Sequence, residues 1–324
     1  MQTVAIIGAG VSSLMCAREL AHEFDITLFE KARGVSGRMA TRRVPEHDIA
    51  FDHGAQYFTI RSQPIEQHLQ KWLSAGIVAP WDGKVVVLRP NELPEVEPTS
   101  RYVAVPAMNA LGKHLAESLD IRLNTRIESA QHSSSGWVLT STDGQKFGPF
   151  DVLVCTAPPE QTNAILGATS PFRGTLVDQQ FDPCWATLVH FPSRIDVDFD
   201  AAFVHENPLR WICRNNSKPG RNAEHECWVL HASGSWSREN LECQPEEITP
   251  RLLEAFAKAT GANLPEPIYA ASHRWRYSAP VEPLDRSYLW DPTVRLGICG
   301  DWCSGARVEG ALFSGHSLAA QLLE

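Results

Sequence analysis

The first thirty residues constrain the fold of this chain more than any other stretch. An apolar run from Thr3 to Ile7 is typical of a buried parallel strand, and it stops at Gly8-Ala9-Gly10. Apolar residues then recur at helical spacing over 11–20, and a second apolar run ends in Glu30. This order of strand, glycine turn, helix, strand and acid predicts a Rossmann-like unit in an α/β protein.

The same stretch predicts a dinucleotide site. Gly8 permits the tight turn, and Gly10 lets the backbone approach a pyrophosphate at the helix N-terminus. Glu30, at the tip of the second strand, is placed to accept hydrogen bonds from ribose hydroxyls. Ser13 occupies the third small position, where a glycine is usual. The alternative is an ordinary strand–helix turn without a ligand.

A basic loop broken by glycines follows Glu30 and indicates that the dinucleotide is FAD. Gly34 and Gly37 give this loop backbone freedom, and the guanidinium of Arg38 suits a pyrophosphate. Here the sequence resembles the flavin amine oxidase superfamily, whose second motif is a G-x-G-G-R loop. Ser36 replaces one of its glycines.

The resemblance continues to the end of the chain. The run from Asp52 to Thr59 is similar to the renalase branch of the superfamily, in which it faces the substrate; a surface hairpin is the alternative. The late Gly-Asp pair and the helix that opens near Val308 resemble the segments that hold the flavin. Motifs and resemblance together predict a set of FAD contacts: Gly8, Gly10, Val11, Ser12, Glu30, Lys31, Gly37, Arg38, Met39, Gly54, Ala55, Ile127, Gly300, Asp301, Arg307 and Val308. Cys303 does not match the superfamily's attachment sequence, so we expect non-covalent FAD.

The expected architecture is a Rossmann-like FAD-binding domain interrupted by a mixed-sheet substrate domain. We assign 1–62, 100–160 and 276–324 to the FAD domain, and 63–99 and 161–275 to the substrate domain. Apolar patterning predicts helices over 63–76 and 247–260 and a further helix that begins within 105–111 with Pro106 in its first turn. It predicts a loop over 90–99 and strands over 85–88, 121–127, 151–157, 184–190, 209–213, 226–231 and 273–277.

Tryptophans and histidines alternate on the predicted strands of the second domain, and such a sheet can cover a flat heteroaromatic ligand. For any single tryptophan, a place in the core is the commoner outcome, and His190 and His231 could each be hydrogen-bonded core residues. The predicted substrate-orienting residues are Gln56, Tyr57, Phe58, Trp185, Thr187, His190, Arg276 and Trp302, with no residue assigned as a catalytic acid or base.

Three functions remain open at this point. The renalase-like resemblance implies oxidation of 2- or 6-dihydro isomers of NAD(P) by FAD and O2, giving NAD(P)+ and hydrogen peroxide. An amine or polyamine oxidase is the second; none of the seven lysines falls where the superfamily's flavin-adjacent lysine is expected, which counts against it. A low-turnover flavin-binding redox partner is the third.

Composition excludes several other classes. A net charge of −9 over 324 residues disfavours nucleic acid and anionic membranes as partners. The eight cysteines form no C-x-x-C pair and read as reduced core thiols, and the twelve histidines show no metal-ligand spacing, so no metal site is expected. The N-terminus lacks the pattern of a signal peptide, and we expect a cytoplasmic protein. The oligomeric state is not predicted.

Overall fold

The computed structural model describes residues 1–168 and 170–324, and its first layer is a Rossmann-like sheet. The predicted opening unit is present as β1 (Gln2–Ile7), α1 (Val11–Leu20) and β2 (Phe24–Phe29). The six-stranded sheet has the order β19-β20-β13-β1-β2-β9. Its other strands are β9 (Asp120–Arg122), β13 (Val152–Cys155), β20 (Leu296–Ile298) and the antiparallel edge strand β19 (Leu289–Asp291).

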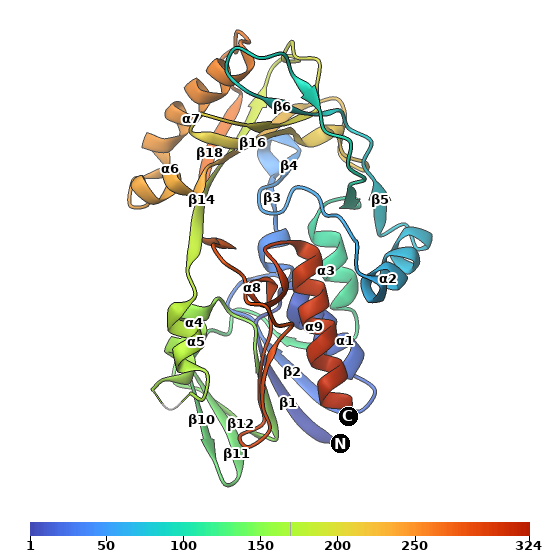
Figure 1. Cartoon of the computed structure of the whole chain (residues 1–324), viewed down its shortest axis with the longest axis vertical. Coiled ribbons are helices and arrows are strands. Elements are labelled where there is room, and N and C mark those ends of the chain that lie inside the picture. The colour runs from blue at the N-terminus through green and yellow to red at the C-terminus, as the bar shows by residue number, and fades with distance from the viewer. Residues whose placement is uncertain (169) are drawn as a thin grey trace.

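Both faces of this sheet are covered, which explains why its strands are apolar throughout. Val4 and Ile6 pack with α1, α3 (Asn109–Leu115) and α9 (Val308–Leu323), whereas Ala5 and Ile7 pack with a small antiparallel sheet. That sheet consists of β10 (Ile127–Ser133), β11 (Gly136–Ser141) and β12 (Lys146–Phe150). Figure 1 shows both termini at this end of the molecule.

The second layer is a mixed seven-stranded sheet with the order β18-β14-β17-β16-β15-β6-β7. Its strands are β6 (Val85–Leu88), β7 (Glu95–Val96), β14 (Phe181–Phe191), β15 (Ala201–Val204), β16 (Leu209–Arg214), β17 (Glu226–Ala232) and β18 (Tyr269–Pro280). Helices α6 (Gly234–Glu239) and α7 (Pro245–Thr260) cover its outer face. The sheet forms the opposite end of the molecule, and β14 and β18 reach back toward the Rossmann-like layer (Figure 1).

Shorter elements connect the two layers. They are the β3 (Thr41–Val44) and β4 (Ile49–Asp52) hairpin, α2 (Gln63–Ser74), β5 (Val78–Pro80), β8 (Tyr102–Ala104), α4 (Pro159–Leu166), α5 (Arg173–Asp178) and α8 (Asp301–Ser304). Short 3₁₀ turns cover Gly37–Met39, Pro45–His47 and Asn215–Ser217. No helix in the described residues is long and apolar enough to span a membrane.

The predicted fold class is confirmed, but several element boundaries differ from the sequence-based ones. The single strand expected over 121–127 is two strands, β9 and β10, because the chain turns through Asn124 at a φ of +54°. The helix expected to have Pro106 in its first turn begins at Asn109, and the loop over 90–99 contains β7. Helix α2, assigned to the substrate domain, buries Ile65 and Leu69 in the hydrophobic cluster that contains α1 and α9. Strand β18 crosses the proposed boundary at 276.

Candidate active site

One cavity of about 1360 Å³ connects the two layers. It runs from the Gly8–Gly10 turn past loop 36–40 and the Gly300-Asp301 pair to the inner face of β16, β17 and β18. Ligand pockets commonly measure about 300–1,000 Å³, so this space suits a dinucleotide together with a second molecule. All sixteen predicted FAD contacts line the cavity, although their contacts with FAD remain predictions.

The glycine turn leaves its backbone open toward the cavity. Gly8 has a φ of +107°, and a Cβ there would lie 2.4 Å from the Thr156 hydroxyl oxygen. Gly10 lines the cavity, and a Cβ there would meet no atom within 4 Å. The empty position beside Gly10 therefore fits a close-approaching phosphate at the start of α1.

Glu30 secures this turn from the next strand. Its buried carboxylate accepts hydrogen bonds from the backbone N–H groups of Ala9 and Ala32, each at 2.8 Å. Each carboxylate oxygen keeps a further lone pair, so Glu30 can support the turn and still accept from a ribose hydroxyl.

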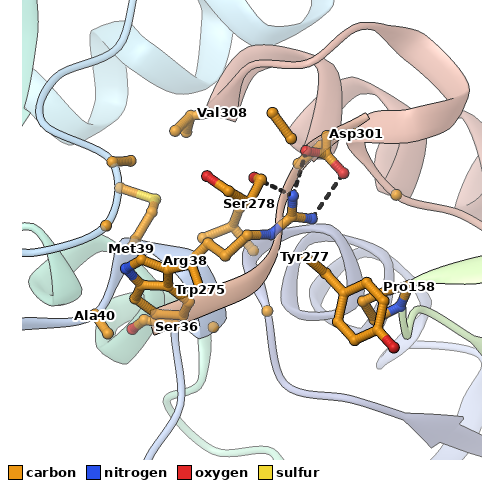
Figure 2. A pocket seen from close by; sticks show the side chains of 18 of the residues that line it. Ser36, Arg38, Met39, Ala40, Pro158, Trp275, Tyr277, Ser278, Asp301 and Val308 are labelled. Carbon is orange, nitrogen blue, oxygen red and sulfur yellow. Dashed lines mark hydrogen bonds and ion pairs between the residues drawn. The ribbon is translucent and has the colours of Figure 1, made fainter. Parts of the chain in front are cut away.

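Arg38 joins three segments that are far apart in the sequence. Its two terminal nitrogens donate to the Asp301 carboxylate at 2.7 Å each, and one of them also donates to the Ser278 carbonyl oxygen at 2.9 Å. Figure 2 shows the bidentate pair and the approach of Ser278 from β18. Asp301 and Ser278 occupy most of the Arg38 donors, and a contact between the remaining donors and the pyrophosphate stays a prediction.

Gly54 brings the end of β4 against the same loop. The Ala55 N–H donates to the Arg38 carbonyl oxygen at 2.8 Å, and a Cβ at Gly54 would lie 1.9 Å from that oxygen. Only a glycine fits this approach, and Gly54 and Ala55 both line the cavity.

Aromatic and imidazole rings line the other end of the cavity. His53, His273 and Trp275 form a group whose ring centroids lie 4.7–5.1 Å apart. The His53 carbonyl oxygen accepts from the Trp275 indole N–H at 3.0 Å and lies 3.1 Å from Nε2 of His231. Tyr57 and Trp211 complete this wall at a centroid distance of 5.3 Å.

The histidines at this end are neutral at pH 7. Burial, aided by the neighbouring His273, lowers the pKa of His53 to about 4. Burial, aided by the charge of Arg210, lowers the pKa of His231 to about 3, and burial also lowers the pKa of His273. The wall therefore offers uncharged imidazoles rather than cations or a strong base.

These shifts predict acid sensitivity. Unfolded histidine binds a proton below pH 6.5, whereas folded His53 and His231 do so only near pH 4 and 3, so stability falls as the pH drops below 6.5. We expect the free energy of unfolding to fall by about 2 kcal/mol per histidine between pH 7 and pH 5. Urea denaturation at both pH values measures it, and a His53→Gln variant should lose less stability on acidification than the wild type. An equal loss in both proteins would contradict the assignment for His53.

Four of the eight predicted substrate-orienting residues line the cavity: Gln56, Tyr57, Phe58 and Arg276. The Gln56 amide is engaged by the protein, since its oxygen accepts from Lys218 Nζ at 3.1 Å and its nitrogen donates to the Gly54 carbonyl oxygen at 3.2 Å. Arg276 forms a bidentate pair with Glu242, with both contacts at 2.8 Å.

The other four predictions are wrong, because these side chains lie outside the cavity. Trp185 packs among the core residues under α6 and α7 and donates to the Asn240 carbonyl oxygen at 3.0 Å. Thr187 is fully buried and hydrogen-bonds Ser272 at 2.7 Å. His190 lies beside His225, with ring centroids 5.0 Å apart, and Trp302 is buried beneath the Rossmann-like sheet.

Sequence reasoning also missed a buried charge cluster behind the cavity wall. The Asp52 carboxylate accepts from Arg221 (at 2.6 and 3.1 Å), from the Thr41 hydroxyl at 2.7 Å and from the Met108 N–H at 2.9 Å. Lys218 Nζ lies 3.5 Å away, and its side chain is completely buried. Burial acts to raise the pKa of Asp52, but the charges of Lys218 and Arg221 hold it below its usual value.

Comparisons with known proteins agree with this geometry. Residues 6–72 match the NAD(P)-binding Rossmann-like domain, and residues 91–323 match the flavin containing amine oxidoreductase family. The chain belongs to that family, and it is a flavin-dependent oxidoreductase of the amine oxidase superfamily. Membership implies FAD, and the open glycine turn and the long cavity fit that cofactor.

Individual relatives are distant. Renalase from Mus musculus is 22% identical over 300 residues, covering 86% of this chain and 85% of the mouse protein. A putative protoporphyrinogen oxidase from Exiguobacterium sp. 255-15 has a TM-score of 0.79 at 12% identity, covering 99% and 98% of the two chains. Cyclohexylamine oxidase from Brevibacterium oxydans IH-35A has a TM-score of 0.77 at 14% identity, with the same coverage. The two structural likenesses show the fold alone.

Proposed function

We propose that this protein oxidises 2- or 6-dihydro isomers of NAD(P), with non-covalent FAD as the electron acceptor. The observation that carries the proposal is the chemistry of the cavity end beside β16–β18: neutral imidazoles, indoles and a phenol, with arginines at the edge. Bound FAD would supply the acceptor for the substrate hydride, and O2 would reoxidise it with formation of hydrogen peroxide. The distant likeness to renalase over most of the chain supports the same reading.

A dihydronicotinamide needs orientation more than acid–base catalysis. Its oxidation restores an aromatic ring, so the driving force lies in the substrate, and the protein has to hold the ring flat at hydride-transfer distance. His53, Trp275, Tyr57 and Trp211 provide aromatic faces for that ring. The depressed pKa values of His53 and His231 keep cationic imidazolium away from the nicotinamide, which becomes positively charged on oxidation.

The charges of the cavity favour an anionic substrate over an amine cation. Glu30 and Glu128 lie at the dinucleotide end, while Asp301 and Glu97 are each paired with an arginine. By contrast, Arg61 and Arg210 line the cavity, are exposed and have no ion-pair partner among the described residues. The diphosphate of a dinucleotide would be attracted to these guanidinium groups, and a polyamine would be repelled.

The Arg210 assignment is testable by kinetics. An Arg210→Met variant should raise the KM for dihydro-NAD about tenfold and change kcat little, because a charge-assisted hydrogen bond to a phosphate is lost in ground and transition states alike. Arg194→Met is the matched control, since Arg194 is exposed but lies outside the cavity. An unchanged KM in the Arg210→Met variant would show that Arg210 does not bind the substrate.

Steady-state turnover tests the proposed reaction. Each dihydro-NAD isomer, ordinary 4-dihydro-NADH, putrescine and cyclohexylamine are supplied separately, and oxygen uptake, hydrogen peroxide and the organic product are measured. We expect peroxide and NAD+ in equal amounts from the 2- or 6-dihydro isomer. Rapid peroxide formation from an amine would instead establish the amine oxidase alternative, and slow turnover with every compound would favour a redox partner protein.

A further inference from the structure

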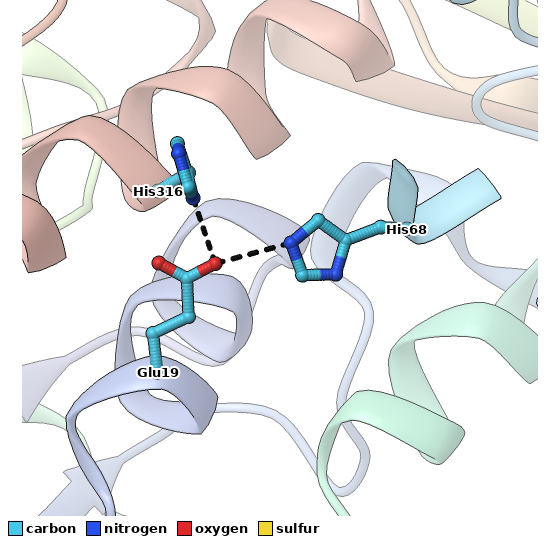
Figure 3. A group of neighbouring side chains, drawn as sticks. All are labelled: Glu19, His68 and His316. Atoms are coloured by element: carbon cyan, nitrogen blue, oxygen red, sulfur yellow. Dashed lines mark hydrogen bonds and ion pairs between the residues drawn. The ribbon is translucent and has the colours of Figure 1, made fainter. Parts of the chain in front are cut away.

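Three side chains from three helices converge on one point outside the cavity (Figure 3). Glu19 extends from α1, His68 from α2 and His316 from α9. Oε1 of Glu19 lies 2.7 Å from Nδ1 of His316 and 3.3 Å from Nε2 of His68. We propose that Glu19, His68 and His316 form a zinc site that clips these three helices together.

The donor set is the one that zinc prefers. Two imidazole nitrogens and one carboxylate oxygen are a common protein ligand set for Zn²⁺, with a water in the fourth position. The three donor atoms lie within 4.8 Å of one another. Tetrahedral ligands at zinc distances are about 3.3 Å apart. The Glu19–His68 separation already has that value, and the Glu19–His316 separation has to open by about 0.6 Å.

The scaffold holds two of the three ligands in fixed positions. A Cβ at Gly315 would lie 2.0 Å from the Ser12 carbonyl oxygen, so α9 and α1 touch through their backbones next to His316. The buried side chains of both helices belong to one hydrophobic cluster, which also contains Ile65, Leu69 and Trp72 of α2. Little conformational freedom is therefore lost when a metal binds, which favours affinity.

The site is open to solvent, and its carboxylate ligand is ionised. The side chains of Glu19, His68 and His316 are 19%, 26% and 29% exposed, so an ion and its water can enter from solvent. Burial acts to raise the pKa of Glu19, but the hydrogen bonds from the two histidines hold it below its usual value, which keeps the carboxylate anionic. Zinc would bind the ring nitrogens that now face Glu19 Oε1, and any protons on these nitrogens would leave to solvent or move to the other ring nitrogens.

The consequence would be structural. None of the three residues lines the cavity, so the metal would take no part in flavin chemistry. The metal would link α2 to α9. These two helices are already joined at one end, because Glu309 in the first turn of α9 accepts hydrogen bonds from the backbone N–H groups of Arg61 and Ser62, just before α2, at 2.5 and 2.6 Å. This inference is independent of the proposed function.

Calorimetric titration of the tag-free, EDTA-treated holoprotein with zinc chloride tests the site. We expect saturable binding of one zinc per chain and a rise in Tm of roughly 3–5 °C at a hundredfold excess over the dissociation constant. A His68→Gln/His316→Gln variant should bind zinc more than tenfold more weakly, whereas His132→Gln, in the distant β10, should bind like the wild type.

Two further measurements keep the result decisive if the double variant fails to fold. Glu19→Gln keeps a hydrogen-bond acceptor between the histidines but loses the anionic ligand, so it should fold, retain FAD and bind zinc more weakly. Cobalt(II) added to the wild type should give absorption at wavelengths longer than those of the flavin, and zinc should abolish it. Absence of saturable zinc binding, or equal binding by Glu19→Gln, would overturn the proposal.

Discussion

A Gly10→Val variant is expected to purify as a folded protein without FAD. Gly10 lines the cavity, and a Cβ there would meet no protein atom within 4 Å. Its backbone, at φ −78° and ψ 173°, is open to any residue, so valine costs the apoprotein little. The added methyl groups would fill the space that a phosphate needs, and we expect FAD affinity to fall on the order of 100-fold or more.

Flavin absorbance of the purified variant and a fluorescence titration with FAD measure this loss, and circular dichroism checks the fold. Gly174→Ala is a matched control, because a Cβ there also meets open space but lies in α5, outside the cavity. Gly54→Ala provides the contrast: its Cβ would lie 1.9 Å from the Arg38 carbonyl oxygen, so this variant should misfold. Wild-type FAD affinity in Gly10→Val would show that the dinucleotide does not approach this turn.

An Asp52→Asn variant should lose about 3–5 kcal/mol of stability. Asp52 is 1% exposed and neutralises the buried Lys218 and Arg221, which come from the segment that follows β16. Asparagine has a similar shape but no charge, and its NH2 group would face these two cations. The variant would thus leave two positive charges buried without compensation behind the cavity wall.

Urea denaturation at pH 7 measures this effect, with Asp198→Asn as the control, since Asp198 forms only a surface pair with Lys84. The folded pKa of Asp52 lies below its unfolded value, so its contribution is complete above about pH 4 and is lost only at lower pH. The difference between Asp52→Asn and wild type should therefore be the same at pH 7 and pH 5. A loss below about 1 kcal/mol at pH 7 would contradict the charge-cluster account.

The Rossmann-like half was predictable because its signals are local. Strand, turn and helix follow one another within the first thirty residues, and the positive φ of Gly8 explains the glycine. Gly8, Glu30 and Gly300 follow the parallel strands β1, β2 and β20, and the carboxyl ends of such strands meet at one edge of a sheet.

The substrate end of the cavity was less predictable because β14 shows no alternation of buried and exposed residues. From Pro183 to Phe191 every residue is buried on both faces of the sheet, so sequence periodicity cannot tell which side chains face the cavity. Trp185 and Thr187 were therefore assigned to the wrong face. On β18, by contrast, His273 and Trp275 are two residues apart and share a face, which is a signal that could have placed both at the site.

Contacts between distant segments left no trace in residue spacing. Asp52 and Arg221 are 169 residues apart, and Glu19 and His316 are 297 residues apart. Both clusters depend on how helices and loops pack in three dimensions, so neither the buried Lys218 nor the histidine–carboxylate group could be found from motifs.

Anaerobic stopped-flow mixing tests the central claim most directly. The oxidised holoprotein is mixed separately with the 2- and 6-dihydro isomers of NAD, with 4-dihydro-NADH and with a panel of monoamines and polyamines, and the flavin absorption band is followed. We predict rapid bleaching by the 2- or 6-dihydro isomer, accompanied by NAD+, with no comparable bleaching by 4-dihydro-NADH or by any amine. Rapid bleaching by an amine, or none by either isomer in protein that holds its FAD, would contradict the account.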